Sequence, residues 1–263
     1  MSGAASSAAL GRLYLVPAPL DFGCESQSPL TDVLPDLTLR TAAGLTHWVS
    51  ENAKSCRAYL KRIDALHPLA APLQAQDIQE LPREAHKKGD HGGKGSAQFD
   101  AKALLAPALA GHDMGLVSEA GMPAVADPGS SIVRAAHDLG MTVVPLVGPV
   151  SLLLSLAASG LNGQNFAFVG YLPQDAAARS QRIKELESLS QRLNQAQLFI
   201  ETPYRNPALW QALLLSLQPG TRLVMASGLT LDNASVQSRT VRDWKKLGTL
   251  PDKHTPVVFA LGQ

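Results

Sequence analysis

The sequence predicts an α/β protein, because strand-length and helix-length apolar runs alternate along the chain. The clearest case is Gly115 to Gly160, where Gly- and Pro-rich loops separate these runs. We expect a strand ending at Ser118, a helix from about Ser130 to Leu139, a strand from Thr142 to Leu146 and a second helix. Such a unit predicts parallel strands with right-handed crossovers. Both loops that follow the strands should therefore emerge at one carboxyl edge of the sheet.

Length and composition indicate a soluble globular enzyme of one large or two modest domains. The chain has 263 residues, of which 45% are hydrophobic, enough to bury a substantial core. The net charge of +1 provides no global field for nucleic acid, so a polyanion partner would need a local patch. Cys24 and Cys56 lie far apart in sequence, which favours reduced structural thiols and a cytoplasmic protein.

Neither a signal peptide nor a membrane segment is expected. The N-terminal MSGAASSAALGR lacks a basic stretch before an apolar core. The uncharged run from Met141 to Gln174 is long enough for a transmembrane helix, but Pro145, Gly148, Pro149 and Gly160 interrupt it. A buried strand and a buried helix explain this run better.

The N-terminal half begins with a strand at Arg12 to Pro17, which leads into Pro-Ala-Pro and a polar loop from Gly23 to Pro35. The elements expected next are a helix at Asp36 to Gly44, a strand at His47 to Ser50, a helix that Glu51, Asn52 and Ala53 begin and that runs to Ile63, and an apolar helix at Ala101 to Gly111 that leads into the Gly115 strand.

The pattern is lost between His67 and Asp100. Gln79 to Phe99 is charged and glycine-rich, and it is predicted to be an exposed loop whose basic residues are either solvated or in contact with phosphate. These basic residues are Arg83, Lys87, Lys88 and Lys94. His86 and His91 lie in the same loop, but no histidine pair has the helical i, i+4 spacing with nearby acids that zinc requires, so no bound metal is expected.

Strands follow one another more closely in the C-terminal half, which predicts an antiparallel or mixed sheet there. We therefore divide the chain near Gly148 into residues 1–147, with a mainly parallel sheet, and residues 148–263. The expected strands are Asn165 to Tyr171, Gln197 to Glu201, Thr221 to Ala226, Val236 to Thr240 and Pro256 to Leu261. The expected helices are Leu152 to Ser159, Ala176 to Leu193, Asn206 to Leu217 and Val241 to Leu247.

The loop SEAGMPAVADPG, residues 118–129, is a candidate ligand loop. Gly121 and Gly129 allow close backbone approach, and such a loop suits a flat, uncharged ligand such as an adenine nucleoside. The sequence has neither GxxxxGK[ST] nor a GxGxxG after a strand, so triphosphate hydrolysis and conventional dinucleotide binding lose their main support. For Asp127 alone, we expect a capping role at the next helix.

The loop ETPYRNP, residues 201–207, allows two interpretations. Tyr204 and Arg205 could steer an anionic or planar substrate while Glu201 accepts a proton. Alternatively, Glu201 and Arg205 are paired in a turn that opens a helix. Nucleophilic catalysis is not expected, because there is no GxSxG and no histidine placed near either cysteine.

Taken in order, several stretches resemble the tetrapyrrole methylase superfamily of S-adenosylmethionine-dependent methyltransferases. They are LYLVPAPL, SEAGMPAVADPG, VVPLVGPVSLLLSLAASGL, FVGYLP, LFIETPYRNP and PVVFALG. More narrowly, the chain is similar to the branch that methylates the ribose 2′-hydroxyl of a cytidine in small-subunit ribosomal RNA. The resemblance implies two α/β domains with a cofactor crevice between them, usually in a homodimer.

The resemblance also implies which residues bind S-adenosylmethionine. Carried over by position, these are Pro17, Pro19, Ser118, Glu119, Ala120, Gly121, Val150, Ser151, Thr202 and Ala226.

Four departures from the ribosomal branch bear more on RNA specificity than on cofactor binding. An insertion from Asp21 to Pro35 replaces a short loop, and Glu51 to Lys54 replaces an acid-aspartate-threonine-arginine run. Glu119 stands where that branch has aspartate, and a His-Asn-Glu stretch is missing around Glu80 to Asp100.

The expected function is methyl transfer from S-adenosylmethionine to a ribose hydroxyl of ribosomal RNA. Two alternatives stay open: a tetrapyrrole or other small-molecule methyltransferase, and a non-catalytic relative that binds cofactor. A sulfonium methyl is already electrophilic, so the protein mainly has to hold the acceptor in line. A base should help to deprotonate a ribose hydroxyl, and Glu51, Glu119 and Glu201 are the hypothetical bases.

Overall fold

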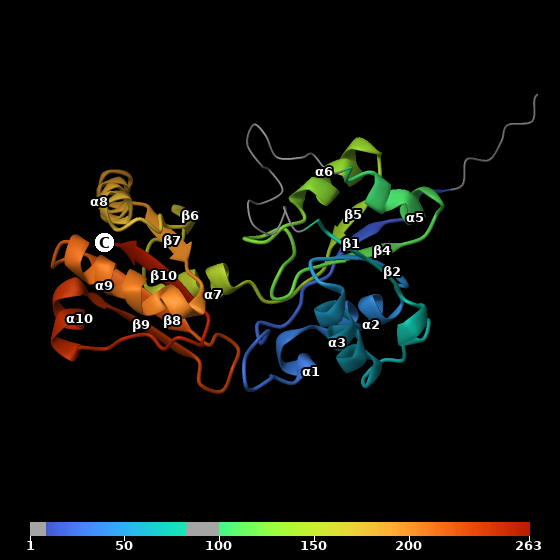
Figure 1. The fold of residues 1–263 in the computed structure, drawn as a ribbon, viewed down its shortest axis with the longest axis horizontal. Coiled ribbons are helices and arrows are strands. Elements are labelled where there is room, and N and C mark those ends of the chain that lie inside the picture. The colour runs from blue at the N-terminus through green and yellow to red at the C-terminus, as the bar shows by residue number, and fades with distance from the viewer. Residues whose placement is uncertain (1–8, 83–99) are drawn as a thin grey trace, which may run out of the picture. The chain divides into compact units, whose positions relative to one another are not determined.

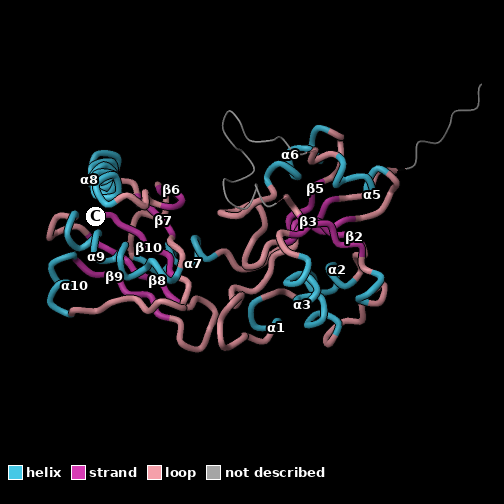
Figure 2. The backbone as a smooth tube through the Cα atoms, in the orientation of Figure 1, coloured by secondary structure: helices cyan, strands magenta, loops and turns pink. Residues whose placement is uncertain are grey.

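The computed structural model describes residues 9–82 and 100–263, which form two compact units (Figure 1). Unit 1 runs to Phe22 and then from Pro29 to Pro149, and unit 2 comprises Gly23–Ser28 and Val150–Gln263. Each unit is built around its own five-stranded sheet. Figure 2 shows strands in magenta with helices in cyan around them in each unit.

The sheet of unit 1 is entirely parallel, as predicted. Its strands, in the spatial order β3-β2-β4-β1-β5, are β1 (Leu13–Leu15), β2 (His47–Ser50), β3 (Asp77–Glu80), β4 (Met114–Val117) and β5 (Val143–Pro145). All five carboxyl ends therefore lie at one edge of this sheet.

Helices cover both faces of the unit 1 sheet. They are α1 (Leu30–Val33), α2 (Asp36–Ala43), α3 (Ala53–Asp64), α5 (Ala106–Leu109) and α6 (Ser130–Asp138), with 3₁₀ turns η1 (Leu73–Ala75) and η2 (Ala103–Leu105). Trp48 packs in the core beside α2 and α3, and Met114 in the core beside α5 and α6. A Cβ on Gly115 would stand 2.4 Å from the Trp48 ring, so this strand glycine makes room for the indole. The Trp48 indole N–H donates to the buried Gln76 side chain at 2.9 Å.

Three sequence predictions for unit 1 need correction. The helix expected at Ala101 to Gly111 is η2 followed by the separate short helix α5. Pro107, which cannot donate a backbone hydrogen bond, lies in the first turn of this new helix. Strand β3 was missed because it is an edge strand of sequence DIQE without apolar alternation. Helix α1 lies within the expected polar loop. Residues 83–99 of the predicted exposed loop lie outside the described residues.

The sheet of unit 2 is mixed, as expected. Its strands, in the order β6-β7-β10-β8-β9, are β6 (Phe166–Tyr171), β7 (Ala196–Ile200), β8 (Arg222–Ser227), β9 (Ser235–Thr240) and β10 (Val257–Gly262). The β6–β7 pair is parallel and the other pairs are antiparallel. Strands β6, β7 and β8 consequently run in the same direction.

One face of this sheet packs against α8 (Ala176–Leu193), α9 (Asn206–Ser216) and α10 (Val241–Leu247), and the other packs against α7 (Ser151–Ser159). The 3₁₀ turn η3 (Pro203–Arg205) precedes α9. Trp210 and Trp244 meet edge to face with ring centroids 4.9 Å apart. Their indole N–H groups donate to the carbonyls of Thr249 and Leu223, both at 2.8 Å. Truncating either ring to alanine would cost about 3–5 kcal/mol.

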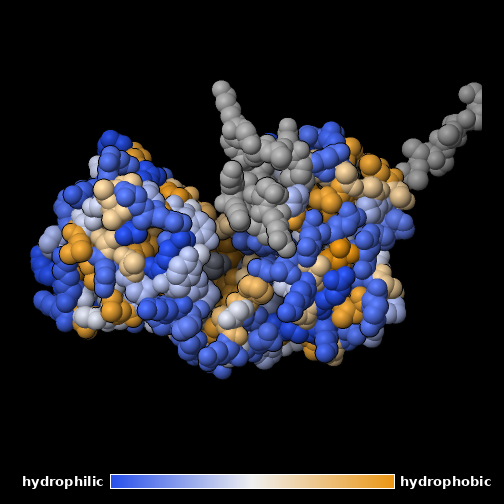
Figure 3. All heavy atoms as spheres, in the orientation of Figure 1, coloured by the Kyte–Doolittle hydropathy of each residue, from blue (hydrophilic) through white to orange (hydrophobic). Residues whose placement is uncertain are grey.

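Within the described residues, no helix has the length and apolar character needed to cross a membrane. The uncharged run from Met141 to Gln174 contains β5, α7 and β6, as its glycines and prolines predict. On the faces of the units drawn in Figure 3, hydrophobic residues form separate spots among hydrophilic ones. Most large apolar side chains are buried in the cores that flank the two sheets.

Candidate functional site

Three turns of unit 1 converge at the carboxyl edge of its sheet. Strand β1 lies between β4 and β5, and the pairs are parallel, so the segments after these strands leave on the same side. The first two turns are joined directly: Ala18 N–H donates to the Gly121 carbonyl at 2.9 Å, and Gly121 N–H donates back at 3.0 Å. The prediction that the loops after Ser118 and Leu146 leave from one edge of the sheet is confirmed.

Two glycines bring the third turn into this cluster. A Cβ on Gly148 would lie 2.3 Å from Pro17 Cγ, so no larger residue fits without a shift. Gly121 has a left-handed φ of +71°, and a Cβ there would lie 3.6 Å from the Pro149 carbonyl oxygen. The predicted positions Pro17, Ser118–Gly121 and the turn at Gly148 therefore gather within unit 1.

Buried, uncharged groups and one ion pair surround the turn that follows β1. Pro17 and Ser118 are buried, and the Pro17 carbonyl accepts a hydrogen bond from the Tyr59 hydroxyl at 2.8 Å. The nearby charges of Arg62 and Asp21 neutralise each other in a two-pronged ion pair of 3.1 and 3.0 Å. This part of the edge, built of backbone groups and paired charges, fits an adenosyl group better than a phosphate chain.

Acidic residues collect beside the turn that follows β4. Glu51 follows β2 and Glu119 follows the neighbouring β4, and the Glu119 N–H donates to Glu51 Oε2 at 3.4 Å. The Ser55 hydroxyl donates to Glu119 Oε1 at 3.3 Å. Burial, and then the charges of Glu51 and Glu119, raise the pKa of Asp127 to about 7. Three carboxyl groups thus lie close together at this edge.

The expected capping role of Asp127 is wrong. The residue that caps α6 is Gly129, with a φ of +129° and no side-chain hydrogen bond to the helix. Ala124 and Ala126, in the same loop, adopt left-handed φ values of 64° and 65° that non-glycine residues rarely take. Strain of this kind collects at functional sites, and here it lies within the three residues before Asp127.

Glu80 also lies at this edge of the sheet, at the end of β3. The sequence did not predict its role, because it did not predict β3. Its carboxylate accepts a hydrogen bond from Ala53 N–H at 2.7 Å, while Asn52 caps the same helix by accepting from Lys54 N–H at 2.9 Å. The first amides of α3 are therefore already occupied. Across the described residues, no group of three or more His, Cys, Asp or Glu side chains is arranged to hold a metal ion.

The remaining predicted cofactor positions, Val150, Ser151, Thr202 and Ala226, belong to unit 2. Ile200 and Ala226 lie opposite the same β10 residue, Val258, one on each side of it. Thr202 follows Ile200 by two residues, and Val150 packs in the same hydrophobic cluster as Ala226. Ser151 begins α7, which covers this face.

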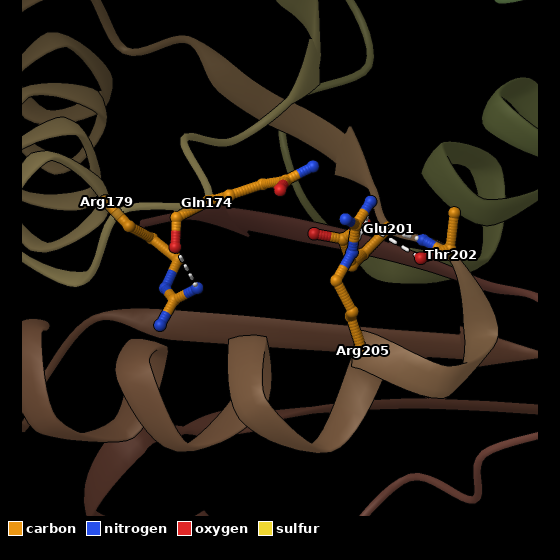
Figure 4. Close-up of polar contacts among 5 residues, drawn as sticks. All are labelled: Gln174, Arg179, Glu201, Thr202 and Arg205. Carbon is orange, nitrogen blue, oxygen red and sulfur yellow. Dashed lines mark hydrogen bonds and ion pairs between the residues drawn. The ribbon is translucent and has the colours of Figure 1, made fainter.

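Glu201 is paired, as one of the two interpretations of its loop requires (Figure 4). Its carboxylate is buried, and Oε1 accepts from Thr202 N–H at 2.7 Å and from Arg205 Nε at 2.9 Å. The Arg205 guanidinium stacks on the Tyr204 ring, 5.2 Å from its centroid. This arrangement engages one of the two carboxylate oxygens and anchors the turn into α9.

The two sheets, with glycine-dependent turns at the carboxyl edge of the first one, define an α/β protein of two units. Residues 51–244 match the family model described as Tetrapyrrole (Corrin/Porphyrin) Methylases. The chain therefore belongs to the tetrapyrrole methylase family of S-adenosylmethionine-dependent methyltransferases. The predicted family and fold are confirmed.

Individual relatives give finer comparisons. The chain is 34% identical over 140 residues to Ribosomal RNA small subunit methyltransferase I of Vibrio cholerae, covering 53% of this chain and 47% of that protein. It is 31% identical over 196 residues to the Bacillus subtilis protein of the same name, covering 74% and 56%. The chain spans about half the length of the curated relatives it matches. The crystal structure of the methyltransferase CobJ has the same fold, with a TM-score of 0.55 at 17% identity over 96% of this chain and 94% of that one.

Proposed function

We propose that this protein transfers the methyl group of S-adenosylmethionine to a ribose 2′-hydroxyl of small-subunit ribosomal RNA. The proposal is supported by the identity to proteins named Ribosomal RNA small subunit methyltransferase I, which the comparison finds in several bacteria. The observation that carries it is the convergence of the Pro17, Gly121 and Gly148 turns in a chain of this family.

The cofactor ligands that we propose are the ten positions listed from the resemblance, from Pro17 to Ala226. When bound, S-adenosylmethionine supplies an electrophilic methyl group. The contribution of unit 1 is a set of backbone groups on three mutually fixed turns, which is suited to holding an adenosyl group in one pose.

The proton acceptor that we propose is Glu51 or Glu119, because these carboxylates lie beside the turn that follows β4. Burial, and then the charges of Glu51 and Glu119, raise the pKa of Asp127 to about 7, so its charge depends on these two acids. Glu201, the third hypothetical base, keeps its Oε1 in the pair with Arg205 and is the weakest of the three.

The working unit that we propose follows the family resemblance. Residues 1–147 and 148–263 are two functional domains of a homodimer that acts in the cytoplasm, where its RNA substrate is made. Analytical ultracentrifugation of the purified protein tests the dimer: sedimentation at the monomer mass of 27.8 kDa would contradict it.

The experiment that tests the proposed function compares acceptors. Calorimetry first measures the affinity for S-adenosylmethionine, and tritium transfer from labelled cofactor is then followed with small-subunit RNA and with a porphyrinogen. We expect transfer to the RNA alone. Transfer to the porphyrinogen would favour a small-molecule methyltransferase, which the family description also allows. Cofactor binding without either transfer would favour a non-catalytic relative.

A further inference from the structure

Two turns of unit 2 lie side by side, and one of them contains Thr202, a proposed cofactor position. Strands β6 and β7 are parallel neighbours, and their last residues, Tyr171 and Ile200, are paired. The turn from β6 to α8, residues 172–175, and the turn from β7 to α9, residues 201–205, therefore leave the same edge of the sheet.

An aromatic ring and a guanidinium are presented together at this edge. The Tyr204 side chain is 65% exposed and Tyr171 is 57% exposed, each at the end of its strand or in the turn that follows. Arg205 lies over the Tyr204 ring, and its Nη2 is held 2.8 Å from the buried Glu201 carboxylate. The buried pair fixes the guanidinium, so the ring is supported from one side and open to solvent.

Arg179 adds a second guanidinium whose charge is not neutralised. It lies in the first turn of α8, where Nη1 donates to the Gln174 carbonyl at 3.3 Å (Figure 4). Its Nε is buried and has no hydrogen-bond partner in the described part of the chain, and no carboxylate there pairs with it. Figure 4 also shows the Gln174 side chain extended toward Glu201 and Arg205. The charge of Arg179 is therefore available to an anion that approaches its Nη groups, since the buried Nε cannot be reached from solvent.

We propose that these residues form a binding surface for a single-stranded segment of the RNA substrate. The surface, here called the two-turn surface, comprises Tyr171, Gln174, Arg179, Tyr204 and Arg205. A base stacks on Tyr204, and a backbone phosphate accepts hydrogen bonds from Arg179. This inference rests on the proposed function, because it identifies where that RNA is held.

The chemistry of the surface favours RNA over a small acceptor. Unpaired RNA is recognised by stacking its splayed bases on aromatic rings and on guanidinium planes, and its phosphates favour the fork of arginine donors. With a net charge of +1, the chain has no global field for RNA, so a local surface of this type is required. A turn that served only to open α9 would need the Glu201–Arg205 pair, but it would not need an exposed tyrosine above it.

The test uses the full chain and a fluorescein-labelled single-stranded RNA of about ten nucleotides, followed by anisotropy. Tyr204→Leu should raise the dissociation constant for RNA by about fivefold to a hundredfold, because a stacking ring is lost. Tyr204→Trp should keep the affinity. Arg179→Gln should weaken binding and lower the slope of log K against log salt by about one phosphate contact.

Matched controls lie at the far ends of the same elements. Phe166 is an exposed aromatic residue at the opposite end of β6, and Arg192 is an arginine near the opposite end of α8. Phe166→Leu and Arg192→Gln should leave RNA affinity unchanged. Affinity for S-adenosylmethionine, measured by calorimetry, should be the same in all five variants, which also shows that each one folds.

The outcomes separate this surface from the proposed function. If the unmodified protein binds and methylates RNA and the Tyr204 and Arg179 variants match their controls, the two-turn surface is wrong while the function stands. If the unmodified protein neither binds RNA nor transfers methyl to it, both proposals are overturned. Ultraviolet cross-linking of thiouridine-containing RNA should label Tyr204 or Tyr171, and labelling confined to unit 1 would contradict the assignment.

Discussion

Gly148 stands against Pro17 so closely that a Cβ on residue 148 would lie 2.3 Å from Pro17 Cγ. Nearly the whole sequence of unit 1 separates these two residues, yet the parallel pairing of β1 with β5 puts the turns that follow them in contact. A side chain at residue 148 has to push the first turn away from the third. The contact therefore couples the packing of unit 1 to the shape of the proposed cofactor edge.

Gly148→Ala should destabilise unit 1 and weaken cofactor binding together. The added methyl group overpacks a tight contact, which typically costs about 1–3 kcal/mol. Urea unfolding should report this loss, and calorimetry should show weaker binding of S-adenosylmethionine. Gly44→Ala is the control, because its Cβ would be 3.4 Å from the nearest atom, the Thr41 carbonyl oxygen, and its φ of −77° suits alanine. Equal behaviour of the two variants would contradict the role given to Gly148.

The acids at the carboxyl edge can be separated by single-turnover methyl transfer. Replacing the true base among Glu51 and Glu119 by glutamine should slow transfer by about 10²- to 10⁴-fold, since a positioned base contributes that much. Substitution of the other acid should have a smaller effect, because it removes only a neighbouring charge. Affinity for cofactor should stay within a few fold in Glu51→Gln, whereas Glu119→Gln changes a proposed cofactor ligand, so transfer is measured at saturating S-adenosylmethionine. Unchanged rates for Glu51→Gln and Glu119→Gln would reject both residues as the base.

Asp127 should make the stability of the protein depend on pH in an unusual direction. Its folded-state pKa of about 7 lies above the ordinary value of 3.8, so the folded protein binds the extra proton between these two values. Stability from this group is present at low pH and is lost as pH rises through the folded pKa. Asp127→Asn mimics the protonated acid and does not lose this stability. As pH rises from 4 to 8, the free energy of unfolding of the variant should therefore increase relative to that of the unmodified protein by an amount on the order of a few kcal/mol.

The measurement is urea unfolding of both proteins across that pH range. Asp138→Asn, which changes an exposed aspartate at the end of α6, serves as the control. Its free energy of unfolding should differ from that of the unmodified protein by the same amount at every pH. If the Asp127→Asn difference is also constant, Asp127 does not hold a proton at neutral pH. Its closeness to Glu51 and Glu119 would then carry no catalytic consequence.

Sequence reasoning was most successful where burial dictates a periodic pattern. The helix at Ala176–Leu193 and the strand at His47–Ser50 were predicted to the residue, since both have a clear apolar face or run. The parallel order of β4 and β5 around β1 followed from connection rules alone. The edge strand β3 was missed because one of its sides has no partner strand and its side chains are mainly polar.

The candidate site was predictable only in part, for a physical reason. Glycine positions indicate where the backbone must turn or approach closely, and Gly121 was identified in this way. The direction of a loop carboxylate depends on backbone angles that no spacing rule provides. Two left-handed alanines carry Asp127 away from the cap position that its sequence context favours. Glu80 contacts Ala53 because β3 pairs with β2 in one particular register. That register could not be predicted, because β3 itself was not.

The Glu201–Arg205 pair should contribute to stability rather than to proton transfer. Arg205→Met would leave Glu201 with the Thr202 N–H and hydroxyl but without its cation, and an unpaired buried carboxylate costs about 1–3 kcal/mol. Arg182→Met is the matched control, because its ion pair with Glu185 is exposed and should contribute less than about 1 kcal/mol. Urea unfolding measures the loss of stability in Arg205→Met and in Arg182→Met. The rate of single-turnover methyl transfer by Glu201→Gln, at saturating RNA, then tests proton transfer. A normal rate with reduced stability supports an anchoring role, since a general base cannot be replaced by an amide. A rate that falls a hundredfold or more while stability is kept would instead make Glu201 the proton acceptor.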